Sequence, residues 1–293
     1  MHTSKRFFGY VYLLLLTFLV STQTHSQQTN PFSEIGKASE AYHKLKRELE
    51  TAKEHPENSE QIALGYLNLG EYYHALGLYT EAIAQYNFAL KQLESNLQDP
   101  LYIKLNNNIG KVYLSLNNFE LAEQHFEETR KASEKLGDDE GLAVALGLLG
   151  SSHEKQGEYE DALQDQRRSL ELFQKLGDDH GVAITNENIG SIYEDLEEFG
   201  LAYEYFKKAY DQLQGSRTTE EINVLNNIGD SFRKRNDYLP ALEYTTKALE
   251  LAKELNDLHQ LESAHKDLSK TYALMGNYEE AHAHLLLAEE YNS

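Results

Sequence analysis

Hydrophobic and polar positions follow one pattern along most of the chain, and this pattern recurs about every 40 residues. A small residue marks each copy, at Gly70, Gly110, Gly150, Gly190, Gly229 and Ser269. Three positions later stands a ring-bearing residue, namely Tyr73, Tyr113, His153, Tyr193, Phe232 or Tyr272. Twelve positions after the small residue stands an alanine, namely Ala82, Ala122, Ala162, Ala202, Ala241 or Ala281. A pattern that holds through six registers predicts six copies of one structural unit.

Each unit is expected to form two antiparallel helices. The Gly or Ser of the first helix would lie opposite the Ala of the second, because two helices approach closely only where one of them lacks bulk. A residue suited to positive φ stands between the helices in most units, at Gly77, Asn117, Gly157, Glu197, Asn236 or Gly276. The pattern therefore predicts an all-α solenoid over residues 62–293, with repeats near 63–96, 103–136, 143–176, 183–216, 222–255 and 262–293.

Two pairs of aspartates recur at the same interval, in LGDDEG from Leu136 to Gly141 and in LGDDHG from Leu176 to Gly181. Paired carboxylates at a fixed spacing can bind a metal ion, act in catalysis or cap helices. Here they fall at the junction between two units, directly after a Gly that can end a helix, and no converging set of further ligands accompanies them. We therefore expect these aspartates to cap helices.

These marks resemble those of the tetratricopeptide repeat, whose small, aromatic and alanine positions match this chain over residues 62–293. The tryptophan found early in that family's repeat is absent throughout. The 40-residue period is similar to a longer-helix subtype, which occurs in kinesin light chains, in spindle scaffold proteins and in repeat regions of bacterial sensor proteins. The resemblance implies a right-handed α-solenoid that binds a protein or peptide segment and performs no catalysis.

The resemblance also implies a concave groove lined by the first helix of each repeat. Residues facing it are expected two or three positions before the small residue and one position after it, and these include Asn68, Asn107, Asn108, Lys111, Asn188, Ser191, Asn226, Asn227 and Lys270. Asn stands two positions before the small residue in four of the six repeats. Its amide offers a donor and an acceptor together, so it can pair with both polar groups of a peptide backbone. Alternatively, Asn is only a polar residue that keeps apolar surface out of the groove.

Repeat three departs from this pattern, because Val144 and Leu148 stand where the neighbouring repeats carry polar groove residues. An apolar patch between Asn108 and Asn188 would suit a hydrophobic anchor side chain of a bound segment. The same two residues could instead pack against neighbouring helices. The sequence leaves both interpretations open.

The first 26 residues are typical of a signal peptide. A short basic start precedes an apolar run from Phe7 to Val20, and this run is shorter than the roughly 20 residues of a membrane span. Thr24 and Ser26 place small residues where a signal peptidase would need them. We therefore expect an extracytoplasmic protein, periplasmic or secreted. The alternative is a retained membrane anchor, the only case in which we expect the protein to contact a membrane.

The two ends of the array are expected to differ from its interior. Residues 27–33 would form a flexible lead-in, and residues 34–61 a capping helix and junction that cover the apolar face of the first repeat. The last helix carries Leu285, Leu286 and Leu287 in succession, and these wrap more than one face. We therefore expect self-association or partner docking through the C-terminal helix.

Composition narrows the class of function. The formal net charge is −21 and no run of Lys or Arg occurs beyond the first residues, which argues against a nucleic-acid partner. There is no Cys, hence no disulfide and no thiolate site, and no motif for nucleotide binding or hydrolysis. His153 and Glu154 begin like a zinc motif, but the second His is missing and His153 holds a repeat position, so we expect it to pack in the core. We expect no enzyme activity, no cofactor and no bound metal.

The preferred function is a non-catalytic scaffold that binds an extended protein or peptide segment in its concave groove. The alternative is the extracytoplasmic input module of a bacterial signal-transduction system of the histidine kinase, cyclase or transcriptional regulator type. That module would continue beyond Ser293 into an output domain.

Overall fold

A computed structural model of the protein describes residues 31–93 and 99–291, and every regular element in these ranges is an α-helix. The helices are α2 (Pro31–Lys53), α3 (Ser59–Ala75), α4 (Tyr79–Gln92), α5 (Pro100–Ser115), α6 (Phe119–Leu136), α7 (Asp139–Gln156), α8 (Tyr159–Leu176), α9 (Asp179–Asp195), α10 (Phe199–Leu213), α11 (Thr219–Lys234), α12 (Tyr238–Leu255), α13 (Leu258–Leu274) and α14 (Tyr278–Tyr291). From α3 onward they form the six predicted helix pairs.

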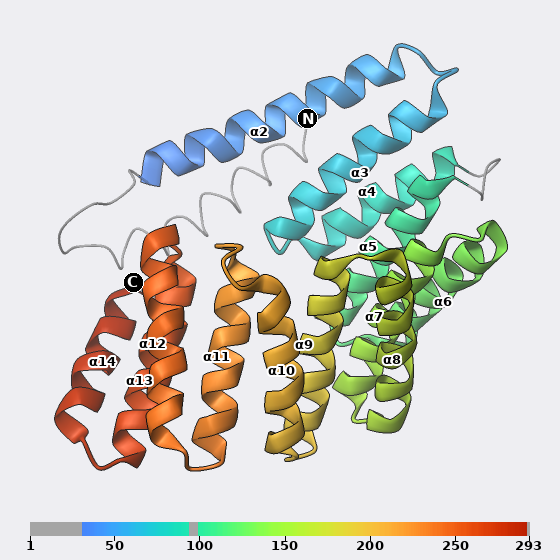
Figure 1. Ribbon diagram of the computed structural model, residues 1–293. Helices are drawn as coiled ribbons and strands as arrows, with labels where there is room; N and C mark the ends of the chain where they lie inside the picture. Colours follow the sequence, from blue (N-terminus) through green and yellow to red (C-terminus); the bar gives the residue numbers. More distant parts are fainter. Residues whose placement is uncertain (1–30, 94–98, 292–293) are drawn as a thin grey trace.

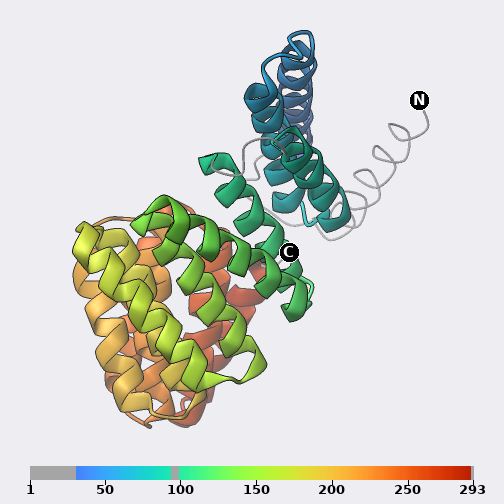
Figure 2. The same cartoon turned by 90° about the vertical axis from the view of Figure 1, so that its right-hand side faces the viewer.

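The pairs follow one another along a curved path, so the fold is the right-handed α-solenoid that the repeat predicts (Figure 1). Each helix packs most extensively on its partner within the repeat. The first helices of successive repeats also touch, as α3 does with α5, α5 with α7, α7 with α9, and α11 with α13. Turned by 90°, the N-terminal helices are seen to lie apart from the C-terminal repeats, with α5 and α6 between them (Figure 2). The first helices therefore form a continuous inner surface.

The small residue of each first helix meets a side chain that the repeat analysis did not single out. A Cβ added to Gly110 would lie 2.3 Å from Cε1 of Phe126, a side chain sixteen positions further on. Gly70 meets Tyr86 and Gly190 meets Phe206 in the same way. The alanine recurs for a different reason. Each of these alanines is almost fully buried, and because Ala lacks bulk, the backbone of the second helix can approach the first helix closely. The carbonyl oxygen of Ala162, for example, lies beside Gly150. In repeats one, two and four the glycine therefore meets chiefly an aromatic ring, whereas in repeats three and five its neighbours include the carbonyl oxygen of the expected Ala.

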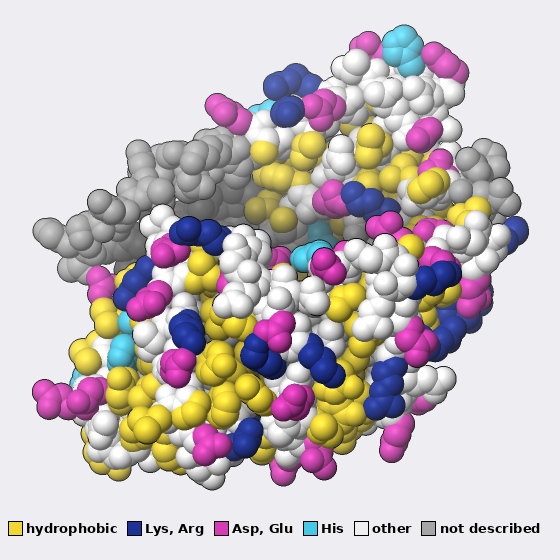
Figure 3. All heavy atoms as spheres, in the orientation of Figure 1, with side chains coloured by type: hydrophobic (Ala, Val, Ile, Leu, Met, Phe, Trp, Pro, Cys, Tyr) yellow, Lys and Arg dark blue, Asp and Glu magenta, His cyan; other side chains and the backbone are white. Residues whose placement is uncertain are grey.

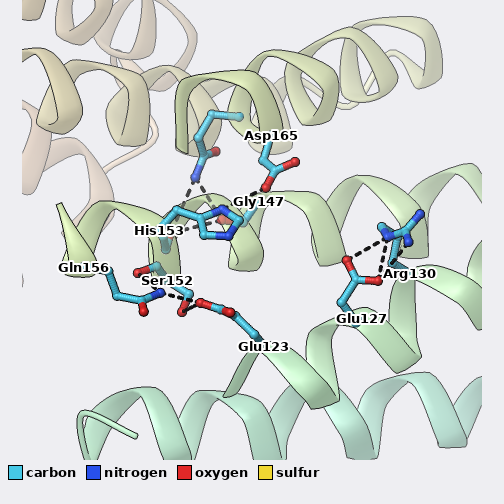
Figure 4. Close-up of polar contacts among 10 residues, drawn as sticks. Glu123, Glu127, Arg130, Gly147, Ser152, His153, Gln156 and Asp165 are labelled. Atoms are coloured by element: carbon cyan, nitrogen blue, oxygen red, sulfur yellow. Dashed lines mark hydrogen bonds and ion pairs between the residues drawn. The ribbon is translucent and has the colours of Figure 1, made fainter. Parts of the chain in front are cut away.

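Repeat three replaces this aromatic packing with hydrogen bonds (Figure 4). Gln166 takes the position of Phe126 and Phe206, is fully buried, and donates through Nε2 to the carbonyl oxygen of Gly147 over 2.8 Å. His153 lies at the repeat's aromatic position, half-buried, with its Nδ1 3.1 Å from Oδ2 of Asp165. This carboxylate raises the pKa of His153. His153 is thus packed between its two helices, as expected, but through a polar pair.

The recurring aspartates cap helices, as predicted. Gly137 ends α6 with φ of 69°, a left-handed conformation that glycine adopts without strain. Asp138 then accepts the backbone N–H of Gly141 over 3.0 Å at the start of α7. Asp178 does the same for α9, where it accepts the N–H groups of His180 and Gly181.

The turns inside the repeats have the predicted backbone conformation. Positive φ occurs in all of them, at Gly77, Asn117, Gly157, Glu197, Asn236 and Gly276. Glu197 is the departure, because a side chain with a Cβ is held at φ 59° where three other repeats use Gly. The backbone at Glu197 is therefore locally strained, and the packing of the two helices in this repeat holds it in that conformation.

The helix α2 begins at Pro31, so three residues of the expected lead-in are helical. It covers the first repeat through Leu49, which packs with Ile62 and Leu69 in one apolar cluster. The expected signal peptide, residues 1–26, lies outside the described residues. Among the residues that are described, no helix is long and apolar enough to cross a membrane.

The last repeat leaves apolar surface exposed. Leu285 stands sixteen positions after Ser269, where the other repeats bury a side chain almost completely, yet 46% of it is exposed. Leu286 and Leu287 are exposed by 54% and 37%. The first helix of a following repeat covers this position everywhere else, and α14 has no such neighbour among the described residues.

Candidate peptide-binding groove

The predicted site residues lie on the first helices α3, α5, α7, α9, α11 and α13, at the turns of each helix that its own partner leaves uncovered. Most are half-buried or exposed, whereas Asn107 and Asn226 are 7% and 9% exposed. On the face drawn in Figure 3, acidic and basic side chains are interspersed rather than gathered into one basic patch. The predicted site residues themselves combine Asn amides with the cations Lys111 and Lys270.

The N-terminal part of the groove is organised around Glu71. Its Oε1 accepts Nδ2 of Asn108 over 3.1 Å and pairs with Nζ of Lys104 at 3.0 Å. Lys111 lies one turn beyond Asn108 on α5, where water reaches its side chain but surrounding protein still desolvates the ammonium. Desolvation lowers the pKa of Lys111, against the charge of Glu71, which raises it, and with the charge of Lys104 acting in the same sense as desolvation. Glu71 is already engaged by two partners, so Lys111 can accept an anionic or carbonyl group from a ligand.

Val144 and Leu148 are the apolar groove residues of repeat three. They lie between the polar groove residues of repeat two and those of repeat four, and both side chains are half-buried. Leu148 packs against the cluster containing Phe126, and Val144 against the cluster containing Phe173. Packing between helices therefore accounts for part of each side chain. The remaining exposed part leaves the hydrophobic-anchor interpretation as a prediction.

In repeat four, Asn188 donates through Nδ2 to Oε1 of the buried Gln166 over 3.4 Å. Ser191 lies beside Glu154 of the preceding repeat, and its hydroxyl hydrogen bond favours the ionised carboxyl. Burial acts in the opposite sense and dominates, so the pKa of Glu154 is raised. These contacts connect α9 to both helices of repeat three, α8 through Gln166 and α7 through Glu154.

A cavity of about 350 Å³ opens in the groove between α9, α11 and α13. Asn227 donates through Nδ2 to Oε1 of Glu187 over 3.0 Å on one side. Asn226 donates to Oε1 of Gln260 over 3.4 Å on another. The Oδ1 atom of Asn226 is buried without a hydrogen-bond partner, and so is that of Asn107 in α5. Unpaired buried acceptors are costly, which makes them candidates for ligand contact.

The electrostatics of this cavity are dominated by buried carboxyl groups. Burial, with the charge of Glu220 nearby, raises the pKa of Glu187 to about 7 even though the Asn227 hydrogen bond acts in the opposite sense. The two cations that line the cavity form ion pairs with aspartates and not with Glu187. Arg233 contacts Asp230, and Lys270 lies 2.9 Å from Asp267. Glu187 forms no ion pair among the described residues.

Three groove residues were not selected from the sequence. Glu71 stands one position after Gly70, so the repeat register itself contained that information. Gln260 and Glu154 lie outside the positions used for the prediction, and only the placement of adjacent repeats brings them to the groove. In the described part of the chain, no three His, Asp or Glu side chains are grouped so that they could hold a metal ion.

A comparison with known protein families identifies the family to which the chain belongs. The tetratricopeptide repeat profile matches residues 61–135, 141–215 and 220–291. The chain belongs to the tetratricopeptide repeat family. A search of curated protein sequences finds no match to this tetratricopeptide repeat protein.

Solved structures share its fold at low sequence identity. The Rap conjugation gene regulator of plasmid pLS20 in complex with the Phr* peptide is 17% identical, with a TM-score of 0.62 over 79% of this chain and 74% of that one. The apo quorum sensor NprR of B. thuringiensis is 15% identical, with a TM-score of 0.60 over 100% and 95%. A putative kinesin light chain of Podosopora anserina with nearly identical repeats is 10% identical, with a TM-score of 0.56 over 68% and 98%. At these identities the likeness establishes the fold alone.

Proposed function

We propose that this tetratricopeptide repeat protein is a non-catalytic scaffold that binds an extended protein or peptide segment in its concave groove. One observation carries the proposal: Asn side chains recur along the first helices, and Asn107 and Asn226 each leave a buried carbonyl oxygen unpaired. The N–H groups of a peptide backbone would satisfy these acceptors once the two amides turn toward the groove. The Rap regulator with the same fold was solved with a peptide bound, which supports the same use of the groove here.

The Asn side chains are already oriented before any ligand arrives. Asn108, Asn188 and Asn227 each donate one N–H to a neighbouring acceptor, at Glu71, Gln166 and Glu187. Each amide nitrogen carries a second N–H, and each side-chain carbonyl has further acceptor capacity. A ligand therefore meets fixed polar groups, which lowers the ordering cost of binding.

The double variant Asn108→Ala/Asn188→Ala tests the proposal. We expect it to capture markedly fewer peptides from a synthetic library of random, acetylated and amidated hexapeptides than the wild type does, with the helical circular-dichroism signal retained. Gln124→Ala/Gln164→Ala is the matched control, because it removes two exposed amides from the second helices α6 and α8. Undiminished capture by the Asn variant, or no capture by the wild type, would overturn the groove proposal.

Export from the cytoplasm is part of the proposal and is supported by the pattern of the first 26 residues. The second candidate function is an extracytoplasmic input module of a signalling system, favoured by the quorum sensor NprR among proteins of this fold. Affinity purification from the native envelope fraction separates the two. Recovery of a membrane-bound kinase or cyclase favours the input module, and recovery of other proteins alone favours the scaffold.

A further inference from the structure

We propose that the cavity between α9, α11 and α13 receives a cationic side chain, an arginine above all, of the segment that binds in the groove. The inference rests on the proposed function and assigns one chemical feature to the ligand. Its starting point is the imbalance of charge inside the cavity. Its lining includes Glu187, Asn223, Asn226, Asn227, Asp230, Arg233, Gln260, Asp267 and Lys270.

Three amide groups of the cavity each donate one N–H to a neighbouring acceptor. Gln260 donates through Nε2 to Oδ1 of Asn223 over 2.7 Å, and Asn226 donates to Oε1 of Gln260. Asn227 donates to Oε1 of Glu187. These bonds link the three helices α9, α11 and α13.

Acceptors remain. Asn226 is 9% exposed, lines the cavity, and leaves its Oδ1 atom without a partner. Glu187 has its Oε1 atom bonded to Asn227, and no hydrogen bond or ion pair engages its Oε2 atom among the described residues. A ligand group that carries several N–H donors would bond Oε2 of Glu187, and a turn of the Asn226 side chain would bring its buried Oδ1 atom to the same group. A guanidinium has five such donors in a planar fork.

Charge points the same way. The cavity lining holds three carboxylates, Glu187, Asp230 and Asp267, against two cations, Arg233 and Lys270. Each cation is paired with its own Asp, so the uncompensated group is Glu187. The raised pKa of Glu187 is the expected consequence of a buried carboxyl that lacks a cation, and a bound guanidinium would restore its ionised form. The volume of about 350 Å³ suits one side chain rather than a folded domain.

The hexapeptide library tests this inference directly. We expect Arg, and Lys to a smaller degree, to be enriched among the peptides that the wild type captures. In Glu187→Gln, which keeps the shape of the side chain, that enrichment should disappear. The Kd of the best Arg-containing peptide should rise by about tenfold or more, because a charge-assisted hydrogen bond is lost. Glu160→Gln, an exposed change on α8, is the control and should leave both measurements unchanged.

A second variant guards against loss of fold. Asn226→Leu removes the unpaired acceptor while keeping the number and branching of the side-chain heavy atoms, and it should also abolish the Arg enrichment, with the circular-dichroism signal retained. Captured peptides without Arg or Lys enrichment would overturn this inference and leave the groove proposal standing. Enrichment that persists in both Glu187→Gln and Asn226→Leu would also overturn it. A wild type that captures no peptide would overturn both proposals.

Discussion

Asn227 on α11 donates a hydrogen bond from Nδ2 to Oε1 of Glu187 on α9, over 3.0 Å and across one repeat length of 40 residues. The same kind of contact joins Asn108 to Glu71 across 37 residues. Groove residues of one repeat are therefore held by polar residues of the repeat before it. The binding surface belongs to the array of repeats and is absent from any single repeat.

The contact between Gly110 and Phe126 predicts a steep cost for one added methyl group. Gly110→Ala should lower the free energy of unfolding by about 1–3 kcal/mol, because the new Cβ would overlap a fully buried ring. Gly200→Ala is the control, since nothing lies within 4 Å of that Cβ, and it should be neutral or stabilising by up to about 1 kcal/mol. Urea denaturation measures both. Equal stability of the two variants would contradict the assigned packing.

The turn at Glu197 predicts a gain in stability. Glu197→Gly should raise the free energy of unfolding by about 0.5–1 kcal/mol, because a left-handed conformation is strained for a residue with a Cβ. Gly157→Ala makes the opposite change at the equivalent turn of the preceding repeat and should destabilise by about 1 kcal/mol. Thermal denaturation followed by circular dichroism would show the two Tm values moving in opposite directions. Shifts of the same sign would count against this explanation.

The sequence predicted these local features well, and the reason is physical. The caps at Asp138 and Asp178 and the turn at Glu197 depend on neighbours within one helix or one turn. Their side-chain requirements therefore recur at a visible spacing. A 40-residue repeat makes that spacing unambiguous.

The groove contacts could not be predicted in the same way. Gln166 lies where repeats one, two and four carry Phe or Tyr, and its bonds to Gly147 and Asn188 depend on how three helices meet. Gln260 reaches Asn226 only because α11 and α13 lie side by side. Such contacts join residues of different repeats, and no single periodicity encodes them.

A pair of histidines between α13 and α14 predicts acid lability. Nδ1 of His265 lies 2.8 Å from Nδ1 of His284, a bond that two neutral rings can form with one as donor. Burial lowers the pKa of His265 to about 4, with the charges of His284 and Lys253 acting in the same sense, and the pKa of His284 is also lowered. The unfolded chain therefore binds more protons, so stability should rise with pH between about 4 and 6.5 and level off above that.

The double variant His265→Phe/His284→Phe isolates this effect. Its Tm should fall less than the wild-type Tm when the pH is lowered from 7 to 5. His125, whose pKa burial also lowers, is present in both proteins and so cancels in the comparison. Parallel Tm profiles for the two proteins would show that the pair does not titrate as described.

The exposed leucines of α14 predict association through the C-terminal end. Leu285, Leu286 and Leu287 present a run of exposed apolar surface, and at the position of Leu285 every earlier repeat buries its side chain. We expect wild-type protein at micromolar concentration to form dimers or larger species by light scattering after size-exclusion chromatography. Leu286→Lys/Leu287→Lys should be monomeric. A wild type that remains monomeric throughout would remove this prediction.

The location of a bound peptide tests the account most directly. A photoreactive p-benzoylphenylalanine would replace Lys111 in the groove in one protein and Glu204 on the second helix α10 in another, both exposed positions. With the best peptide from the hexapeptide library, we predict crosslinking from position 111 that excess unlabelled peptide suppresses, and none from position 204. Equal crosslinking from the two positions, or crosslinking from position 204 alone, would contradict the claim that the concave groove binds the ligand.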